Sequence, residues 1–442
     1  MRFLVLMFFF GLCATFACGQ TPDTTAAWQA LIKAKQLAGQ GKFDSSIVAY
    51  KQTSVGYKNY AAHLRDQQAA DAIKAWERHF NARMQIGWLL NQTGHSDTAL
   101  AVLNATLIDA QNRLGVKHRL VSNILNTLGV VCTINGAYDT GLEYHQKALA
   151  LRLELFGQKH MEVASSYNNI GIVYNYKSAF DRALDCYQKA LTMKLEFLGP
   201  KHQQIAETYD NMGLVYHDRG AYDQAMDYFQ KALALKFELL GPKHPQIGES
   251  YNNIGAINEQ QGAYDGAKSY YHKALALRLE ALGPHHPVVA TGYSNLGSLH
   301  SKMGAYDQAL DYHQKALALF METLGPRHPN VADCYFNMGG VYMKAGADDQ
   351  ALDYFQKALA LRLEVIGPKN AEVAAVYWGI GTVYERKEAY EQALVHYEKS
   401  LAAYIPSYQS GYLYTGLGVT GADVLNSTLR YTTKTLMAHP ST

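Results

Sequence analysis

Glycine recurs in this sequence every 42 residues, and this period restricts the fold more than any other feature. The glycines in question are Gly129, Gly171, Gly213, Gly255, Gly297, Gly339 and Gly381. Tyrosine stands four residues before six of these seven glycines, and two columns of alanine share the same spacing. A single globular core requires no such regularity, whereas a stack of repeated supersecondary units does.

Each period carries the pattern of two amphipathic helices. Between Val163 and Tyr174, apolar residues return at the three- and four-residue intervals that mark one helical face. A short turn follows at residues 178–181, and a second apolar stripe runs from Leu184 to Leu198. We therefore expect each period to fold as a helix-turn-helix unit, with no strands.

The junctions between periods carry helix stop and start signals. In the run from Gly241 to Pro245, the glycine suits a left-handed C-terminal cap, and the proline after it cannot continue the helix. Pro245 suits the first turn of the next helix, where its missing N–H has no cost. Gln203 and Ala371 occupy the same slot without proline, so these two helices have weaker start signals.

The repeated glycine lies inside the expected first helix. A glycine there costs about 1 kcal/mol relative to alanine, so its repetition needs a compensating interaction. We expect close approach of the second helix, with tyrosine and leucine side chains packed around the missing side chain. The excess of tyrosine, 32 residues against 15 Phe, also points to a repeated structural position.

The residues from Tyr251 to Leu275 resemble the tetratricopeptide repeat, in the 42-residue form of kinesin light chains and many bacterial repeat proteins. The resemblance covers residues 119–404 and implies an all-α, right-handed superhelical solenoid of helix-turn-helix repeats. Residues 24–118 fit degenerate repeats whose turns contain Gly41 and Gly94, which makes about nine units in all. Residues 405–442 depart from the pattern; they suggest a connector and a capping helix at Asp423–Met437.

The N-terminus is typical of an exported protein. Residues 1–19 contain a basic start at Arg2, an apolar run and small residues, as a secretory signal peptide does. The run is shorter than a spanning helix needs, although an uncleaved anchor is an alternative. Cleavage before Cys18 would leave a cysteine able to carry lipid, the one expected link to a membrane. We predict a periplasmic, envelope or extracellular location.

Composition and local motifs argue against several function classes. A formal net charge of +2 gives no strong attraction to nucleic acid. Cys132, Cys186 and Cys334 are far apart in the sequence and suggest buried apolar positions rather than a disulfide framework. The run Gly416 to Gly421 matches a dinucleotide fingerprint but lacks room for the strand-helix-strand unit. No cofactor is predicted.

Histidine also recurs once per unit, at the junctions: His118, His160, His202, His244, His286 and His328. Neighbouring units should lie about 10 Å apart, and metal–nitrogen bonds are about 2.0–2.1 Å, so one ion could not bridge two of these rings. We therefore expect no metal site, and instead local capping of the following helix by each histidine.

Two polar columns on the first helices are the candidate binding residues. Asparagine stands two residues before the glycine at Asn169, Asn211, Asn253, Asn295 and Asn337. Five residues after the glycine, the last three units carry Lys302, Lys344 and Arg386. The resemblance implies that both positions face a concave groove, where a carboxamide can bind a peptide backbone and the cations an acidic ligand. Alternatively, the amides tie neighbouring helices together and the charges are merely solvated.

We therefore predict a scaffold that binds segments of partner proteins in a groove, and not an enzyme. No Ser/His/Asp or Cys/His set stands apart from the repeat pattern. Two alternatives remain open at this point. The chain resembles repeat arrays that precede caspase-related peptidase domains, so it could be the sensor part of an exported peptidase system whose catalytic domain is encoded elsewhere. It could also be a structural spacer in the envelope.

Overall fold

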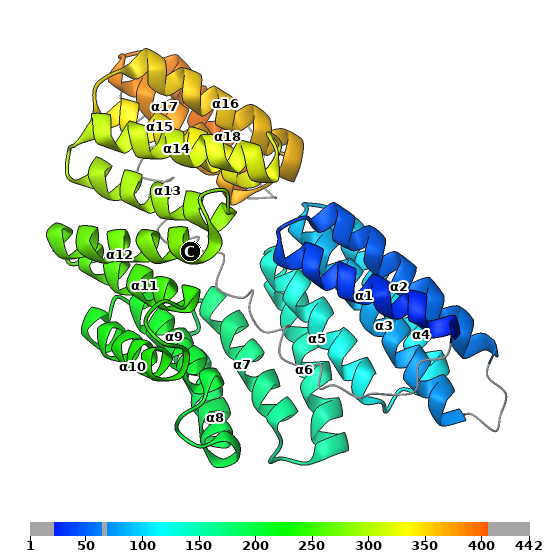
Figure 1. Cartoon of the computed structure of the whole chain (residues 1–442). Helices are drawn as coiled ribbons and strands as arrows, with labels where there is room; N and C mark the ends of the chain where they lie inside the picture. The colour runs from blue at the N-terminus through cyan, green and yellow to red at the C-terminus, as the bar shows by residue number, and fades with distance from the viewer. Residues whose placement is uncertain (1–21, 64–68, 405–442) are drawn as a thin grey trace, which may run out of the picture. The chain divides into compact units, whose positions relative to one another are not determined.

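The computed structural model describes residues 22–63 and 69–404, and within those ranges the chain forms eighteen α-helices and no strand (Figure 1). The expected leader at residues 1–19, Cys18 and the segment 405–442, with its proposed capping helix and glycine-rich run, lie outside the described residues. Contacts divide the chain into two compact units, Met1–Tyr228 and Phe229–Thr442. The boundary falls inside the tenth helix.

The first four helices correspond to the degenerate repeats. They are α1 (Pro22–Gly39), α2 (Phe43–His63), α3 (Ala69–Gln92) and α4 (Ser96–Leu114). The predicted turns lie between α1 and α2 and between α3 and α4, where Gly41 and Gly94 have φ angles of 73° and 83°. Helices α2 and α3 are longer than the others, at 21 and 24 residues, and pack on each other as extensively as partners within a repeat.

The remaining fourteen helices form the seven regular repeats, each with a first and a second helix. The first helices are α5 (Arg119–Ile134), α7 (Met161–Tyr176), α9 (Gln203–Asp218), α11 (Pro245–Gln260), α13 (Pro287–Lys302), α15 (Pro329–Lys344) and α17 (Ala371–Arg386). The second helices are α6 (Tyr138–Phe156), α8 (Phe180–Leu198), α10 (Tyr222–Leu240), α12 (Tyr264–Leu282), α14 (Tyr306–Leu324), α16 (Asp348–Ile366) and α18 (Tyr390–Tyr404). Together with α1 to α4, these make eighteen helices in the described ranges.

Histidine caps the first helix in six of the seven regular repeats, as predicted. In each case the ring nitrogen Nδ1 accepts a hydrogen bond from the backbone N–H two residues later, over 3.1 to 3.3 Å. The seventh start uses Asn370, whose Oδ1 accepts from the N–H of Glu372 at 2.8 Å. This cap satisfies one of the free N–H groups of a helix start. It also explains why α9 and α17 begin at the regular position without proline.

Glycine ends the second helices with a positive φ angle, but in a different region from the one predicted. Gly241 has φ 76°, and the equivalent Gly283 has φ 79° with ψ 167°. This ψ value excludes the left-handed helical conformation, which needs ψ near 47°. It places Gly283 in an extended region that is nearly exclusive to glycine. The junction therefore depends on glycine more strictly than a left-handed cap would.

The repeated glycine of the first helix allows close packing of the second helix, as predicted. A Cβ atom added at Gly171 would lie 2.8 Å from the ring of Tyr187, and one at Gly255 would lie 2.8 Å from the ring of Tyr271. The same slot holds histidine at His145 and His313. Aromatic rings also stack between helices of one repeat, which accounts for the excess of tyrosine.

The first helices lie closer to their counterparts in neighbouring repeats than the second helices do. Contacts join α5 to α7 and α7 to α9 in one unit, and α13 to α15 and α15 to α17 in the other. No comparable contact joins consecutive second helices in the described part of the chain. Within each unit, the first helices therefore line the inner side of the curve.

The three cysteines of the repeats are buried and unpaired, as predicted. Burial raises the pKa of Cys186 to about 11 and that of Cys334 to about 12, so these thiols are unreactive at neutral pH. Among the helices of residues 22–63 and 69–404, none combines the length and apolar character that a membrane span requires.

Candidate functional site

Three of the five candidate asparagines link consecutive first helices. In each case the Nδ2 group donates to the carboxamide oxygen of an asparagine 43 residues earlier, which is one repeat and one residue back. The bonds run from Asn169 to Asn126 (2.7 Å), from Asn211 to Asn168 (3.3 Å) and from Asn295 to Asn252 (2.5 Å). We call these three hydrogen bonds the amide ladder.

The amide ladder uses the donor side of each carboxamide and leaves the acceptor side. Asn169, Asn211 and Asn295 are half-buried, and in the described part of the chain no protein group donates to their Oδ1 atoms. The ladder lies on the first helices, which line the inner side of each unit. An unused acceptor at this position is available to a donor on a ligand.

The other two candidate asparagines differ from this pattern. Asn253 is only 4% exposed, which leaves little of its side chain accessible to a ligand. Asn337 is half-buried like the ladder residues, but the slot one residue and one repeat earlier holds Ser294, and no ladder bond forms there. The asparagine column is therefore uniform in sequence but not in structure.

The three basic candidates also contact the preceding repeat. The ammonium group of Lys302 lies 2.8 Å from the carboxylate of Glu259, and that of Lys344 donates to the hydroxyl of Ser301 over 3.4 Å. The Nε atom of Arg386 lies 3.1 Å from the carboxylate of Asp348. Two of the three charges are therefore compensated. Lys344 is the member of the column for which no carboxylate partner is found in the described ranges.

A column of buried cations in the second helices was not anticipated from the sequence. Its members are 0 to 6% exposed and recur with the 42-residue period: Arg152, Lys194, Lys236, Arg278 and Arg362. Phe320 takes the place of the cation in α14. The signal was present as a charged residue repeated between leucines, but long cations usually extend to solvent, so the pattern alone favours an exposed position.

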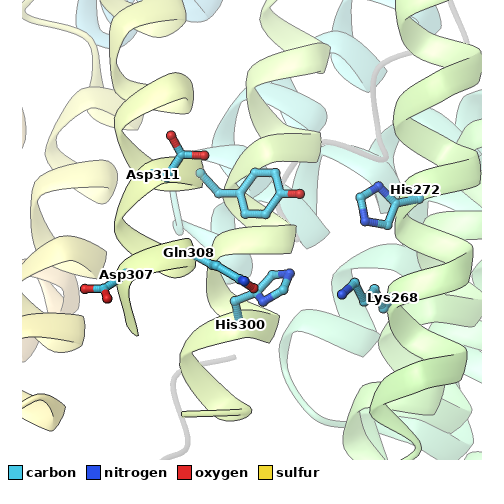
Figure 2. Close-up of a pocket in the computed structure, with 7 residues that line it drawn as sticks. Lys268, His272, His300, Asp307, Gln308 and Asp311 are labelled. Carbon is cyan, nitrogen blue, oxygen red and sulfur yellow. The ribbon is translucent and has the colours of Figure 1, made fainter. Parts of the chain in front are cut away.

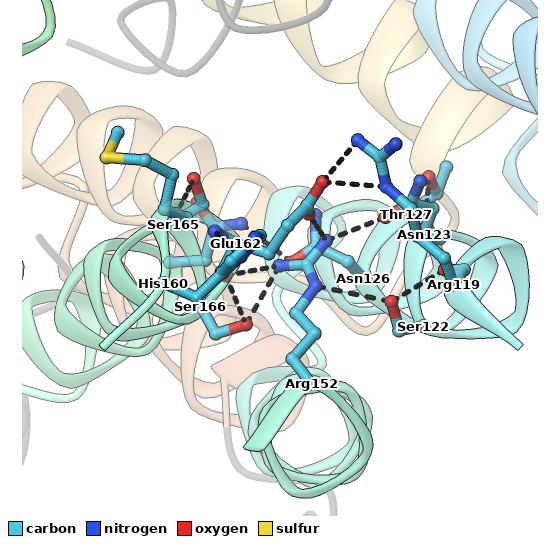
Figure 3. Close-up of polar contacts among 12 residues, drawn as sticks. Arg119, Ser122, Asn123, Asn126, Thr127, Arg152, His160, Glu162, Ser165 and Ser166 are labelled. Carbon is cyan, nitrogen blue, oxygen red and sulfur yellow. Dashed lines mark hydrogen bonds and ion pairs between the residues drawn. The ribbon is translucent and has the colours of Figure 1, made fainter. Parts of the chain in front are cut away.

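Arg152 shows what such a cation does. It extends from α6 between α5 and α7, and all three of its nitrogen atoms have partners (Figure 3). Nη1 donates to the Ser166 hydroxyl (2.8 Å) and the Glu162 carbonyl (3.0 Å), and Nη2 to Asn123 (2.8 Å). Nε donates to Ser122 over 3.3 Å, and the Glu162 carboxylate lies 3.0 Å from Nη2. Arg152 therefore joins two consecutive repeats.

The hydrogen bonding of the other members differs from one to the next. Lys194 donates to the Thr208 hydroxyl over 2.8 Å, and burial lowers the pKa of its ammonium group to about 8 against the opposing effect of Glu207. Arg278 keeps Nε and Nη1 buried without a hydrogen-bond partner. Burial lowers the pKa of Arg278, and Glu249 opposes that shift. The column is structural, and the number of hydrogen bonds that its cations make varies between repeats.

The described residues contain no group of three His, Cys, Asp or Glu side chains placed to hold a metal ion. The junction histidines each cap a helix instead. His145 and His313 are buried beside the repeated glycines, and burial lowers their pKa values to about 3 and about 4. Both therefore act as neutral packing groups near pH 7.

Comparison with solved structures shows the same fold in a Rap protein and in the quorum sensor NprR, and a weaker likeness to a third protein. A Rap protein complexed with Competence and Sporulation Factor has 15% identity, covers 85% of this chain and 97% of its own, and has a TM-score of 0.55. The apo quorum sensor NprR from B. thuringiensis has 14% identity, covers 84% of this chain and 99% of its own, and has a TM-score of 0.53. A Podosopora anserina protein assigned as a kinesin light chain has 16% identity, with 47% and 98% covered and a TM-score of 0.40.

No curated protein sequence matches the chain. A family model does, and its description is tetratricopeptide repeat. The matched segments are residues 120–196, 180–238, 204–280, 246–322, 288–364 and 336–405. Together they extend over more than half of the chain and coincide with the regular helix pairs α5 to α18, so the chain belongs to the tetratricopeptide repeat family.

Proposed function

We propose that this chain is a non-enzymatic scaffold that binds an extended segment of a partner protein along its first helices. The observation that carries this proposal is the row of unused carboxamide oxygens on the amide ladder. A backbone N–H of an extended ligand is the complementary donor and carries no sequence information. Such a surface would bind peptide main chain in general, with side-chain contacts selecting the partner.

The amide ladder lowers the number of hydrogen bonds that each asparagine can offer to a ligand, compared with the number expected from the sequence. A free carboxamide could donate to and accept from a peptide unit, but here the donor is already engaged, so each asparagine offers one hydrogen bond. Successive first helices pack about 8–10 Å apart, and an extended chain advances about 3.3 Å per residue. Between Asn169 and Asn211, which belong to one unit, one ligand N–H in every three would therefore reach a ladder oxygen.

The basic residues of the first helices add a second basis for selecting a ligand. Glu259 and Asp348 compensate Lys302 and Arg386, so an acidic ligand residue would gain little there. Lys344 contacts only the hydroxyl of Ser301 among the described groups, which leaves its charge for a ligand carboxylate. We therefore propose one acidic contact at Lys344 in place of a ladder of three.

Two further observations support a protein partner of this kind. The Rap protein that shares the fold was solved in complex with Competence and Sporulation Factor, so this architecture accommodates a bound partner in at least one relative. The signal-like residues 1–19 predict that this chain meets its partner outside the cytoplasm, and an exported or envelope protein is therefore the proposed ligand.

The decisive experiment compares Asn295→Ala with Asn252→Ala. Both substitutions break the same ladder hydrogen bond, but only Asn295→Ala removes the oxygen offered to a ligand. Peptides selected from a random display library on the intact chain provide the ligand, and fluorescence anisotropy measures the affinity. We expect Asn295→Ala to weaken binding about fivefold to tenfold, the effect of one lost hydrogen bond, and Asn252→Ala to change it little.

Circular dichroism of both variants checks that helicity is retained. Equal weakening by the two substitutions would mean that the ladder acts only through the packing of the helices, and the proposed binding mode would be wrong. Lys344→Gln tests the charge separately. It should weaken selected peptides that contain an acidic residue and leave neutral ones unchanged.

A further inference from the structure

A second surface feature lies in the unit of residues 229–442, on the side of the second helices. An open cavity of about 510 Å³ is bounded by α12, the end of α13 and α14 (Figure 2). Its lining residues are Lys268, His272, His300, Asp307, Gln308, Asp311 and Tyr312. The volume falls within the range of small-molecule and side-chain binding sites. None of the residues of the amide ladder contributes to it.

Three of the lining residues are basic, and each departs from the repeat pattern at its position. Lys268 stands where the other regular repeats have Leu142, Leu184, Met226, Leu310, Leu352 and Leu394. His272 stands where they have Gln146, Gln188, Gln230, Gln314, Gln356 and Glu398. His300 stands where they have Cys132, Tyr174, Tyr216, Asn258, Tyr342 and Tyr384. Packing of the repeat requires none of the three, because six other repeats pack without them.

The structure brings these three departures to one place. Lys268 and His272 extend from α12 toward the cavity, and the ring of His300 faces them from the end of α13 (Figure 2). The carboxylates of Asp307 and Asp311 turn away from this group in the same view, and Asp311 pairs with Lys315 at 2.6 Å. Neither of these two carboxylates therefore lies between the three basic groups.

His300 is a buried residue in the wall of the cavity, and one of its two ring nitrogens has no hydrogen-bond partner. The residue is 3% exposed, its ring stacks on Tyr312 with centroids 5.3 Å apart, and its Nδ1 atom has no hydrogen-bond partner. Burial lowers the pKa of His300, and the charges of Lys268 and His272 lower it further. The pKa of His272 is lowered in the same way by burial and Lys268. A bound negative charge would relieve this repulsion.

We propose that this cavity binds an oxyanion, a carboxylate or phosphate group, through Lys268, His272 and His300. The proposal goes beyond the binding of a peptide main chain on the first helices, because it uses none of the residues of the amide ladder and a different chemistry. Lys268 supplies a fixed charge, and the two imidazoles supply N–H donors that become charge-assisted when the bound anion raises their pKa values. The oxyanion belongs either to an acidic segment of a partner protein or to free phosphate.

Nuclear magnetic resonance of the imidazole nitrogens in histidine-labelled full-length chain tests the site. Inorganic phosphate is one probe and a short Glu-rich peptide is the other, each titrated at constant ionic strength near pH 6.5, the ordinary pKa of histidine. We expect saturable shifts at His272 and His300 with at least one probe. Tighter binding of the peptide would identify a partner carboxylate as the source, and tighter binding of phosphate would identify free phosphate.

The matched variant is Lys268→Leu with His272→Gln, which restores the residues of the other repeats and should fold. It should weaken binding by about tenfold or more, as expected for lost charge-assisted contacts. His300→Tyr introduces the residue that four other repeats have at this position. It is an independent second test, in which binding is followed by the chemical shift of His272. No saturable shift with either probe, or unchanged affinity in both variants, would overturn the proposal.

A charge-matched control moves the two cations by one repeat. Leu310→Lys with Gln314→His, added to the Lys268→Leu and His272→Gln variant, keeps the net charge but faces Tyr342 in place of His300. Binding should remain weak in this variant. Full recovery would show that overall charge, not this cavity, attracts the anion, and would also overturn the proposal.

Discussion

Arg152 and Arg278 occupy the same slot of two repeats, yet their surroundings differ. Both are buried, at 4% and 6% exposure, and both extend from a second helix toward two first helices. Arg152 has partners for all three of its nitrogen atoms, whereas Nε and Nη1 of Arg278 have none. Both repeats contain the cation, but the full set of hydrogen-bond partners is present only around Arg152.

The cause is visible residue by residue. Each of the four side chains that contact Arg152 has a different counterpart, 126 residues later, around Arg278. Ser122, Asn123, Glu162 and Ser166 correspond to Gly248, Glu249, Val288 and Gly292. Both hydroxyls are lost, and the acidic group has moved from the following repeat to the same repeat. Arg278 therefore keeps a favourable Coulomb interaction with Glu249, but its Nε and Nη1 lack the hydrogen bonds that these atoms make in Arg152.

Arg362 is intermediate between the two in how many of its nitrogen atoms have partners. It donates to Asp333 over 2.7 Å and to the Glu372 carbonyl over 2.8 Å, but its Nε has no partner. A buried cation with all its hydrogen bonds stabilises a junction. One with unpaired donors has a desolvation penalty that its remaining interactions do not fully offset. A position that holds a cation in most repeats can therefore contribute differently to stability in each of them.

The largest expected effect is the difference between Arg152→Met and Arg278→Met. Removal of Arg152 leaves the polar groups around it without their donor, so we expect a loss of about 3 kcal/mol in the free energy of unfolding. Removal of Arg278 takes away an incompletely paired buried charge, and the change should lie within about 1 kcal/mol of zero or be stabilising. Urea denaturation of both variants measures the difference. Equal losses would contradict the comparison.

Lys194, in the same column, extends the comparison to a cation that can lose its charge. Its pKa in the folded chain is about 8, below the ordinary 10.5. Between these values the unfolded chain binds more protons, so this group makes stability rise with pH over that window. The stability of Lys194→Met relative to the parent should therefore fall by about 2–3 kcal/mol between pH 7 and pH 10, because only the parent gains stability over that window.

Denaturation of parent and variant at the two pH values measures this shift as a difference, in which the other titrating groups cancel. Phe320 shows that the slot accepts an apolar residue, so the variant should pack normally. A stability difference between Lys194→Met and the parent that stays constant from pH 7 to pH 10 would mean that the ammonium group is not the source of the pH dependence.

The contrast between Arg152 and Arg278 also marks what the sequence can predict. The period, the two helices of each repeat, the turn glycines and the histidine caps follow from local rules, because each depends on residues within a few positions. The partner of Asn169 does not, since the 43-residue offset depends on how neighbouring first helices are rotated and packed. Burial of Arg152 and convergence of Lys268 with His300 require the spatial arrangement of three helices.

A smaller effect should follow from giving Arg278 one of its missing partners. Gly292→Ser restores the hydroxyl that Ser166 provides to Arg152, and a Cβ at this position would lie 3.7 Å from Nη1 of Arg278. Gly292→Ala is the matched control, because both substitutions bring Cβ to 3.0 Å from Leu275 Cδ1 and both remove a helical glycine. We expect the serine variant to be about 1 kcal/mol more stable than the alanine variant in urea denaturation. Identical stability would show that Arg278 gains nothing from a hydroxyl there.

The smallest effect concerns the turn between the two helices of a repeat, where the same inequality appears in the backbone. Five regular repeats have glycine there with a positive φ angle, but Ser178 (φ 54°) and Glu388 (φ 56°) adopt it with a side chain. A left-handed conformation costs a non-glycine residue about 1–2 kcal/mol, and glycine offsets part of this gain through its more flexible unfolded state. Ser178→Gly and Glu388→Gly should therefore each stabilise the chain by about 0.5–1 kcal/mol in thermal or urea denaturation.

Gly220→Ser is the reverse experiment and should cost a similar amount, because Gly220 (φ 79°) holds the same turn position as Ser178. If all three variants shifted stability in the same direction, the strain at this turn would not come from the side chain, and the repeats would be equal here after all.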